Sequence, residues 1–469
     1  MYNKTAHIHF IGIGGIGMSG IATILRYQGY RISGCDIDLD QSSVKKLIEL
    51  GCAIFQGNNT SACHDPSIDI VVYSSAIQPH NPEIRAAQAR SIPTIPRALM
   101  LAELMRTKYS VAIAGSHGKT TTTSLISHIL IEAALDPTVI IGGHLHAISH
   151  NARAGEGDFL VAEADESDRS LLHLYATLAV VTNIDLEHLE TYKDLNDIKQ
   201  TFKQFLSHLP FYGSAILCIE DENIQALLPI PTIKTILYGL SPRADWYATD
   251  IILYSDYSTF TLHHKNFEQS LGPVTLNMPG THNVLNSLAA IAIAQELNVP
   301  LPVIKKALAT FKGVDRRFSY KGTYKKAELF DDYGHHPKEI DCTLSVARKR
   351  AKKRLIVIFQ PHRYSRTHAL WQSFIESFLK SPIDHLIITD IHGASETPIP
   401  GVTSKQFTET LKTHHPPFPI SYAPLDPTFH AIKQAIDSTI QEDDLLLFLG
   451  AGKINRMIPA LTQLLIETK

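Results

Sequence analysis

The sequence lacks any run of about 18 consecutive apolar residues, the length that a membrane-spanning helix needs. It also lacks a charge excess: 43 lysines and arginines face 46 aspartates and glutamates, so the composition does not indicate nucleic-acid binding. The first residues contain no apolar segment followed by a cleavage-type site, so we expect no signal peptide. We therefore expect a cytoplasmic protein that binds neither membranes nor nucleic acids.

Cysteine and tryptophan are scarce, with five and two residues respectively in a chain of 469. The cysteines form no closely spaced pair of the kind that binds zinc and no even disulfide framework, which fits a reducing compartment. The composition is otherwise that of an ordinary globular protein, with 44% apolar residues. The chain is too long to fold around one hydrophobic core. We expect several domains, each with its own core.

A strand, a glycine loop and a helix follow one another from residue 111 to residue 130. Backbone amides of such a loop and of a helix N-terminus bind phosphates, and Lys119 adds a cation. The usual motif has an earlier glycine where this sequence has Ile113, so an ordinary strand-to-helix turn is the alternative. The candidate nucleotide-binding residues are Gly115, Ser116, His117, Gly118, Lys119, Thr120 and Thr121.

The N-terminal region has a second glycine pattern. Residues 7–11 predict a strand, a G-x-G-x-x-G sequence follows it, and Asp36 comes after the next predicted strand. This predicts a dinucleotide-binding unit with Asp36 on a ribose hydroxyl, and the alternative is a Rossmann-type unit for another nucleotide or for none. Ser74 and Ser75 end a further predicted strand. The candidate ligand residues are Gly12, Gly14, Gly15, Gly17, Asp36, Ser74 and Ser75.

Two later strands are predicted to end in metal-binding side chains. Residues 159–162 lead into a group of carboxylates that begins with Glu163, and residues 179–182 lead toward His188. Mg²⁺ prefers oxygen ligands and usually takes one or two carboxylates beside a phosphate. Thr120, Glu163 and His188 are therefore candidate metal ligands. The alternatives are a solvated acidic turn and a structural histidine.

Polar side chains also gather at the start of a predicted helix. His282, Asn283 and Asn286 are three or four residues apart and share one face. They are either helix caps or ligand contacts, and their number favours ligand contacts. Arg317 lies in a predicted domain joint at residues 311–320, where it either clamps a phosphate or is solvated.

The C-terminal third contains a basic cluster after a predicted core strand at residues 355–359. His362, Arg363 and Arg366 follow this strand directly. Because ligands bind outside the carboxyl ends of parallel strands, the cluster predicts a site for a carboxylate or phosphate.

Predicted strands and helices alternate along most of the chain, which favours an α/β fold with parallel sheets. Residues 210–275 look less regular and suggest a small β excursion. We expect a Rossmann-like N-terminal domain at 1–107, a central phosphate-loop ATPase domain at 108–314, and a Rossmann-like C-terminal domain at 315–469.

Motifs in all three regions resemble those of the Mur ligases, the ATP-dependent enzymes that form amide bonds in peptidoglycan assembly. The motifs are HIHFIGIGGIGMSGIA (7–22), AGSHGKTTTT (114–123), AEADESD (162–168), VTNIDLEHLETY (181–192), PGTHNVLNSLAA (279–290), GVDRRF (313–318), DDYGHHP (331–337) and QPHRYSRT (360–367). Two details depart from the family pattern. Ser116 stands where many relatives have threonine, and Leu186-Glu187 stand where Ala-Asp is frequent.

The resemblance changes the expected ligand of the first domain from NAD to the UDP part of a sugar nucleotide. It implies an enzyme that uses ATP and Mg²⁺ to join L-alanine to the lactyl carboxylate of UDP-N-acetylmuramate, as a monomer or weak homodimer. A family member that adds a recycled tripeptide to the same sugar nucleotide is the alternative. A nucleotide-binding regulator with weak ATPase activity is the alternative from a different class.

The resemblance also implies roles for individual residues. Lys119 would contact the β- and γ-phosphates, Thr120 and Glu163 would bind one Mg²⁺, and His188 would bind a second. The adenosine and phosphate contacts would come from His282, Asn283, Asn286, Arg317 and, at the ribose, Asp332. The acyl end and the alanine carboxylate would be held by His335, His362, Arg363 and Arg366.

Overall fold

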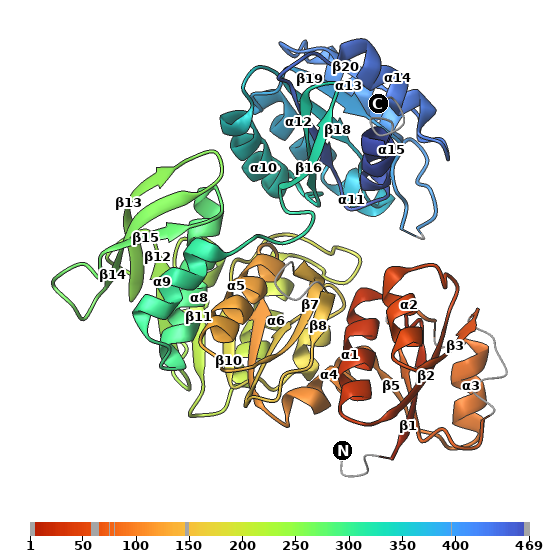
Figure 1. The fold of residues 1–469 in the computed structure, drawn as a ribbon, viewed down its shortest axis with the longest axis vertical. Helices are drawn as coiled ribbons and strands as arrows, with labels where there is room; N and C mark the ends of the chain where they lie inside the picture. Colours follow the sequence, from red (N-terminus) through yellow and green to blue (C-terminus); the bar gives the residue numbers. More distant parts are fainter. Residues whose placement is uncertain are drawn as a thin grey trace. The chain divides into compact units, whose positions relative to one another are not determined.

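Three sheets rich in parallel strands organise the chain (Figure 1). The computed structural model describes residues 5–57, 65–74, 76–78, 80–145, 150–394 and 396–463. Two compact units are present. The first comprises Met1–Ile251, Thr259–Asn277 and Asn283–Lys312, and the second comprises Ile252–Ser258, Met278–His282 and Gly313–Lys469. None of the helices in the described part of the chain has both the length and the apolar run that crossing a bilayer requires.

The N-terminal sheet has five parallel strands in the order β3-β2-β1-β4-β5. Its elements are β1 (His7–Ile11), α1 (Ile16–Tyr27), β2 (Arg31–Asp36), α2 (Ser42–Glu49), β3 (Ala53–Gln56), β4 (Ile70–Tyr73), α3 (Pro82–Ala89), β5 (Thr94–Pro96) and α4 (Arg97–Met105). Helices α1 and α2 pack against each other, while α3 lies at the other side of the sheet (Figure 1). Because both sheet faces are covered, β1 is buried along its whole length.

The central sheet has ten strands in the order β15-β14-β13-β12-β11-β10-β6-β9-β7-β8. Its first elements are β6 (Tyr109–Ala114), α5 (Lys119–Glu132), β7 (Thr138–Leu145), β8 (His150–Arg153), β9 (Phe159–Glu163), a 3-10 turn (Ser170–His173), β10 (Leu178–Val181) and α6 (Leu195–Ser207). Strands β9, β6 and β10 are adjacent and parallel, so the loops that follow them emerge at one edge.

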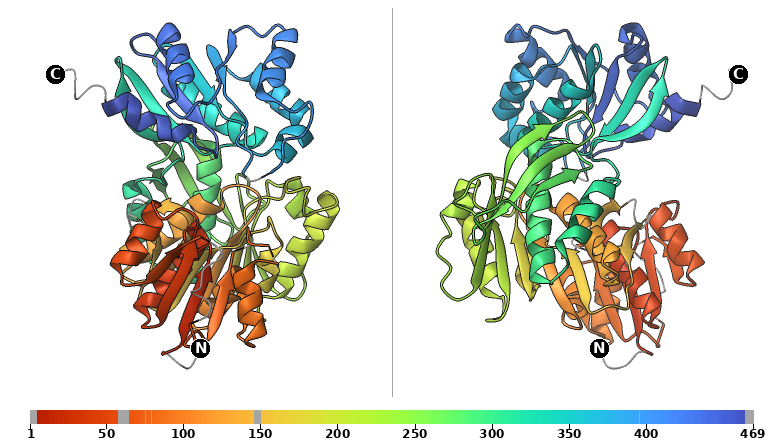
Figure 2. Two further views of the ribbon diagram at one scale, coloured as in Figure 1. Left: turned by 90° about the vertical axis from the view of Figure 1, so that its right-hand side faces the viewer. Right: turned by 60° about the vertical axis from the view of Figure 1, so that its left-hand side comes forward.

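The second half of the central region extends the same sheet. It contains β11 (Ser214–Cys218), α7 (Glu222–Gln225), β12 (Lys234–Gly239), β13 (Trp246–Leu253), β14 (Ser258–His264), β15 (Pro273–Leu276), α8 (Thr281–Glu296) and α9 (Leu301–Thr310). Strands β13 to β15 form the green extension in Figures 1 and 2. Residues 210–275 are therefore more regular than the sequence predicted, since β11 and β12 continue the parallel pairing.

The C-terminal sheet has six strands in the order β16-β17-β21-β18-β19-β20, and only the β16–β17 pair is antiparallel. Its elements are β16 (Ser319–Tyr324), β17 (Ala327–Asp332), α10 (Pro337–Arg350), β18 (Leu355–Phe359), α11 (Tyr364–Ala369), α12 (Trp371–Lys380), β19 (His385–Ile388), α13 (Ser404–Thr413), β20 (Ile420–Tyr422), α14 (His430–Thr439), β21 (Leu445–Leu449), a 3-10 turn (Ile454–Arg456) and α15 (Met457–Gln463). One apolar cluster lies beneath α10, α12 and α13, and another beneath α14 and α15.

The predicted α/β class is confirmed, with a Rossmann-like sheet in the N-terminal region, a parallel-rich sheet in the central region and a Rossmann-like sheet in the C-terminal region. The domain boundaries proposed at 107 and 314 stay predictions. The first of them falls between α4 and β6, and the second lies two residues beyond the point where the compact units divide.

Strand β1 gives a direct test of the N-terminal core. Ile8 is buried in β1, whereas Ile37, just after β2, is 70% exposed. We expect Ile8→Ala to reduce the free energy of unfolding by about 2–5 kcal/mol, because truncation leaves a cavity. Ile37→Ala should change it by less than about 0.5 kcal/mol. Urea unfolding followed by circular dichroism measures both, and equal losses would contradict the assigned core.

Candidate functional site

The glycine loop after β1 is fixed by the end of β2. The backbone amides of Gly12 and Ile13 donate to the Cys35 carbonyl at 2.9 and 3.0 Å. The Gly14 amide donates to Asp36 Oδ2 at 2.7 Å. A Cβ atom on Gly14 would lie 2.8 Å from that same oxygen, so the close approach requires glycine. Asp36 thus holds the glycine loop through a hydrogen bond from the Gly14 amide. The contact of Asp36 with a ribose stays a prediction.

The other predicted N-terminal residues surround this loop. The Gly15 amide donates to the Gly12 carbonyl at 3.4 Å. A Cβ atom on Gly12 would lie 3.4 Å from the Cβ atom of Ser74, and one on Gly17 would lie 3.1 Å from Arg97 Nη1. Ser75 lies outside the described residues.

Arg97 is a site residue that the sequence analysis missed. It begins α4 directly after β5, at the carboxyl edge of the N-terminal sheet. Its Nη2 atom lies 3.4 Å from Asp165 Oδ2 in the carboxylate segment after β9. The sequence carried no clear signal for it, because β5 is only three residues long and contains a proline.

The phosphate-binding loop between β6 and α5 has two glycines in unusual conformations. Gly118 has φ of +82° and directly precedes α5, while Gly115 has φ of +130°. A Cβ atom on Gly115 would lie 2.1 Å from Thr182 Oγ1 and 3.0 Å from the Thr182 amide. Both backbone torsion and packing therefore exclude a side chain at Gly115.

The residues after β10 hold the phosphate-binding loop in place. Thr182 Oγ1 and Asn183 Nδ2 donate to the His117 carbonyl at 2.6 and 3.0 Å. The His117 amide donates to Asn183 Oδ1 at 2.8 Å, and the Asp185 amide donates to Ser116 Oγ at 2.8 Å. The sequence pattern at this strand end indicated a metal site, so the supporting roles of Thr182, Asn183 and Asp185 were not predicted.

Lys119 lies over the loop that precedes it. Its Nζ atom donates to the Gly115 carbonyl at 2.5 Å and to the Ser116 carbonyl at 3.1 Å. Nζ also donates to Glu166 Oε1 at 2.8 Å. Burial opposes the charge of Lys119, but the carboxylate of Glu166 outweighs burial and the net effect raises the Lys119 pKa. Lys119 is thus a positive charge held at the loop where phosphate is expected.

Two acidic side chains and one histidine come together beside Lys119. Glu166, Glu187 and His188 each bring one ligand atom into a group in which all atoms lie within 4.8 Å of one another. His188 Nε2 lies 3.5 Å from Glu166 Oε1 and 3.7 Å from Glu187 Oε2. Burial disfavours a charged His188, yet its contacts with Glu166 and Glu190 raise its pKa to about 9. The two carboxylates therefore favour a positive charge at this position, carried either by His188 itself or by a bound metal ion.

This group fits a divalent cation. Among the described residues no hydrogen-bond donor reaches the buried Oε2 atom of Glu166. A buried carboxylate oxygen without a donor is costly unless a cation neutralises it, and carboxylate oxygen is the ligand that Mg²⁺ prefers. Glu166 and Glu187 were not among the predicted ligands, although both lie in the Mur ligase motifs at residues 162–168 and 181–192.

Glu163 and Thr120, the other predicted metal ligands, lie close to the same loops. Glu163 ends β9, and its Oε1 atom accepts a hydrogen bond from the Gly142 amide at 2.9 Å. Thr120 is in the first turn of α5. The structure groups His188 with Glu166 and Glu187, so metal binding by Glu163 and Thr120 stays a prediction.

Helix α8 meets the phosphate-binding loop through Asn286. A Cβ atom on Gly118 would lie 2.7 Å from Asn286 Oδ1, and Thr122 Oγ1 donates to the same oxygen at 3.2 Å. Asn286 Nδ2 donates to Asn283 Oδ1 at 3.3 Å. Thr121 is buried in the first turn of α5. These contacts place Asn286 against the loop, while the adenosine role of the two asparagines stays a prediction.

The second unit contains its own group of predicted site residues. Asp332, at the end of β17, is buried and accepts hydrogen bonds from the amides of Phe318 and Gly334, both at 2.7 Å. Thr343 Oγ1 adds a third bond at 3.1 Å. Burial raises the Asp332 pKa despite the opposing charge of Arg317. Asp332 therefore fixes the turn after β17, and its contact with a ribose stays a prediction.

Arg317 lies beside that turn. Its guanidinium is 5.6 Å from the Tyr333 ring centre, and its Nη1 atom lies 3.7 Å from Glu339 Oε1. His282 belongs to the same unit, where burial and the nearby charge of Arg317 lower its pKa to about 4. A neutral His282 beside a cationic Arg317 suits an anionic or polar ligand.

The basic cluster after β18 also comes together. Arg366 Nη1 donates to His362 Nδ1 at 3.1 Å, and the rings of His335 and His362 are 5.7 Å apart. Burial, followed by the charge of Arg366, lowers the His362 pKa to about 3, and burial lowers the His335 pKa well below its usual value. Two neutral imidazoles thus lie beside Arg366 at the carboxyl edge of the C-terminal sheet.

Arg363 is positioned by residues that the sequence analysis missed. Its amide donates to the His392 carbonyl at 2.8 Å, and its Nη1 atom lies 3.6 Å from Glu396 Oε1. Glu396 also accepts from the amide and hydroxyl of Ser365 at 3.0 and 2.7 Å. Arg363 has φ of +68°, an uncommon backbone conformation for a side chain of this size. Such strain at a strand end is frequent in binding sites.

Models of three protein-family domains match the chain in succession. They are described as the Mur ligase family catalytic domain at residues 7–109, the Mur ligase middle domain at 113–294, and the Mur ligase glutamate ligase domain at 316–452.

Full-length relatives match as well. The UDP-N-acetylmuramate–L-alanine ligase of Syntrophotalea carbinolica is 47% identical over 99% of both chains, and that of Desulfatibacillum aliphaticivorans is 48% identical over 97% of this chain and 98% of its own.

Among solved structures, the UDP-N-acetylmuramate-alanine ligase MurC of Thermotoga maritima has a TM-score of 0.82 at 26% identity, with 99% of this chain and 100% of that chain covered. A murein peptide ligase from Psychrobacter arcticus shares the fold, with a TM-score of 0.72 at 24% identity and 98% of each chain covered. With the predicted motifs matched in all three domains, the chain belongs to the Mur ligase family.

Proposed function

We propose that this chain uses ATP to join L-alanine to the lactyl carboxylate of UDP-N-acetylmuramate, in the synthesis of peptidoglycan precursors. The observation that carries the proposal is the full-length similarity, at 47–48% identity, to curated ligases with that activity. The phosphate-binding loop and the basic cluster supply the chemistry that such a reaction needs. The peptide-adding ligase of the same family is the second candidate.

The first unit supplies the nucleotide chemistry in this proposal. The loop amides and Lys119 bind the β- and γ-phosphates of ATP, which the charge of Lys119 favours. Glu166, Glu187 and His188 would hold one Mg²⁺. Thr120 and Glu163 would hold another, as the family resemblance implies. Bound Mg²⁺ neutralises charge on the transferring phosphoryl group. The N-terminal glycine loop and Asp36 bind the UDP part of the sugar nucleotide.

The second unit supplies the contacts for the reacting acid and amine. Arg363 and Arg366 pair with carboxylate groups, while the neutral rings of His335 and His362 provide hydrogen-bond partners without repelling the incoming amine. Arg317 would contact the ATP phosphates, and His282 and Asp332, also of this unit, the adenosine. Asn283 and Asn286, which belong to the first unit, would also contact the adenosine.

The reaction proceeds in two steps. The lactyl carboxylate attacks the γ-phosphorus of ATP, which releases ADP and leaves an acyl phosphate. The neutral amine of L-alanine then attacks the acyl carbon, and the tetrahedral intermediate expels phosphate and loses a proton to give the amide. Catalysis depends mainly on positioning and on charge neutralisation. We place this reaction in the cytosol, by a monomer or weak homodimer.

An ADP-release assay tests the function. The purified full chain is given ATP and Mg²⁺, and then UDP-N-acetylmuramate together with single amino acids or the tripeptide in turn. We expect ADP release to depend on the sugar nucleotide and L-alanine together. Dependence on tripeptide in place of alanine would identify the peptide-adding ligase, and release that ignores both cosubstrates would identify a nucleotide-binding regulator.

Glu166→Gln tests the metal assignment in the first unit. The amide keeps the shape of the side chain but removes the charge beside Lys119 and His188. We expect the Mg²⁺ concentration for half-maximal rate to rise about 10- to 100-fold, with much of kcat regained at saturating Mg²⁺. Glu156→Gln, at an exposed position in the same unit, is the matched control. A loss of kcat with an unchanged Mg²⁺ requirement would exclude the metal role.

Arg363→Ala tests the basic cluster of the second unit. Loss of a charged hydrogen-bonding group costs about 1.5–3 kcal/mol, so we expect KM for L-alanine or for the sugar nucleotide to rise about 10- to 100-fold. Arg363→Lys should regain only part of the loss, because lysine lacks the planar two-pronged donor. Lys405→Ala, on the exposed face of α13, should leave both KM values unchanged. Unchanged KM values for Arg363→Ala would remove this arginine from the site.

A further inference from the structure

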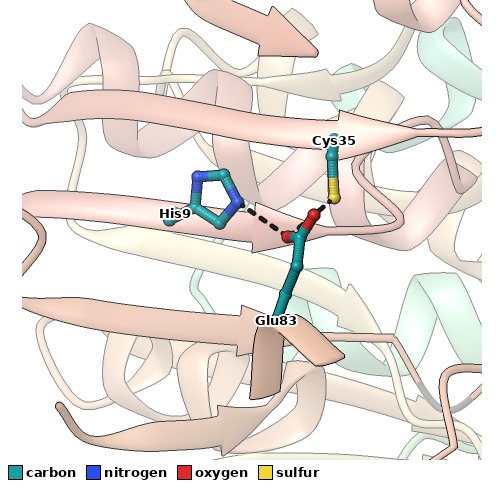
Figure 3. Close-up of side chains that lie close together, drawn as sticks. All are labelled: His9, Cys35 and Glu83. Atoms are coloured by element: carbon teal, nitrogen blue, oxygen red, sulfur yellow. Dashed lines mark hydrogen bonds and ion pairs between the residues drawn. The ribbon is translucent and has the colours of Figure 1, made fainter. Parts of the chain in front are cut away.

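A second group of possible metal ligands lies in the N-terminal domain, away from the phosphate-binding loop. His9, Cys35 and Glu83 come from three different elements and point toward one another (Figure 3). Their relative exposures are 0%, 0% and 1%, so the group is closed to bulk water. None of the roles assigned to the ligase reaction uses these side chains.

The topology of the sheet explains why they meet. In the parallel register His9 pairs with Ser33, and Ile11 pairs with Cys35. Because side chains alternate along strands, His9 and Cys35 are on the same face of β1 and β2. Glu83, in the first turn of α3, points toward this face and not toward solvent. The three ligands are therefore attached to rigid, regular elements.

Two distances within the group are close to those between neighbouring ligands of a zinc ion, and all three ligand atoms lie within 4.8 Å of one another. His9 Nε2 lies 3.3 Å from Glu83 Oε2, and Cys35 Sγ lies 3.1 Å from the same oxygen. Ordinary zinc bond lengths place neighbouring nitrogen and oxygen ligands about 3.3 Å apart, and sulfur and oxygen ligands about 3.5 Å apart. A cation can thus replace the protons between these atoms with only small side-chain movements.

Charge balance also favours a divalent cation. A thiolate and a carboxylate carry two negative charges, and a neutral imidazole carries none. A divalent cation makes the buried group neutral, which avoids the high cost of an isolated charge in the core. A thiolate ligand selects zinc-class cations over Mg²⁺, which takes oxygen ligands. The group therefore differs in metal preference from the Glu166 cluster.

Ser33 orients the His9 ring for this role. Ser33 Oγ lies 2.8 Å from His9 Nδ1 and 2.7 Å from His7 Nε2, and His7 Nδ1 lies 2.9 Å from Ser67 Oγ. The single Ser33 proton can be donated to His7, so that His9 Nδ1–H donates to Ser33. That arrangement leaves a lone pair on His9 Nε2, which faces Glu83. Metal-binding histidines commonly have such a partner on the second nitrogen.

The group lies directly below the N-terminal glycine loop. The Cys35 carbonyl accepts hydrogen bonds from the Gly12 and Ile13 amides, and the next residue, Asp36, accepts one from Gly14. A metal bound by Cys35 would therefore restrain the strand end that supports this loop. The site is structural, and its existence does not depend on the proposed ligase activity.

We propose that His9 Nε2, Cys35 Sγ and the Glu83 carboxylate bind one zinc-class divalent cation beneath the glycine loop of the N-terminal domain. Glu83 brings two oxygens, so three side chains can fill four coordination positions. Binding displaces the thiol proton of Cys35 and any proton that His9 Nε2 and Glu83 share.

Cobalt substitution and zinc counting test the proposal on the full chain. We expect about one zinc per chain to survive dialysis, attributable to this site. Co²⁺ should give a thiolate-to-cobalt charge-transfer band, which only a sulfur ligand produces. Cys35→Ser should abolish the charge-transfer band and lose that zinc. Co²⁺ at the Glu166 cluster cannot produce the band, because that cluster has no sulfur.

Matched variants make the result specific. Cys218→Ser replaces a buried cysteine of the central sheet, and Cys342→Ser replaces an exposed one, so both should keep the band. Ser33→Ala removes only the partner of His9 and should weaken binding about 10- to 100-fold. This variant also serves if Cys35→Ser does not fold, as judged by circular dichroism.

Two results would overturn the proposal. One is a cobalt complex of the wild-type chain without a sulfur band, which would leave the three residues as a hydrogen-bonded core group. The other is zinc content or a sulfur band that persists in Cys35→Ser or vanishes in Cys218→Ser or Cys342→Ser.

Discussion

In the first unit, each ligand-binding loop is held in shape by residues at the end of the neighbouring strand. The sites of this unit depend on that support. The phosphate-binding loop follows β6, but its shape is set by Thr182 and Asn183 after β10. The N-terminal glycine loop follows β1, but its amides are held by Cys35 and Asp36 at the end of β2. In both cases adjacent parallel strands end at the same edge, so the residues of one strand can hydrogen-bond to the loop of the other.

Electrostatics then distinguishes the two units. In the first, two carboxylates, those of Glu166 and Glu187, lie beside His188 and near Lys119. This arrangement suits a metal ion and a phosphate. In the second, Arg363 and Arg366 lie near histidines whose pKa values are lowered, an arrangement suited to carboxylate ligands and a neutral amine. This division follows the chemistry of the proposed ligation, in which phosphoryl transfer precedes attack by an amine.

Sequence reasoning predicted most elements because strands buried on both faces are long apolar runs, as in β18 and β21. It also located Lys119 and the basic cluster, since these follow such strands directly. It did not find Thr182, Arg97 or Glu396, because their roles depend on contacts between residues far apart in the chain. It could not join His9, Cys35 and Glu83 for the same reason: cysteine spacing reveals metal sites only when the ligands are close in sequence.

The close approach at Gly115 has a consequence for how this enzyme could change under selection. Even a methyl group there would overlap the hydroxyl of Thr182, and the backbone torsion adds a further penalty. An inhibitor whose binding depends on the main chain at Gly115 would therefore contact a position that cannot be substituted without distorting the phosphate-binding loop.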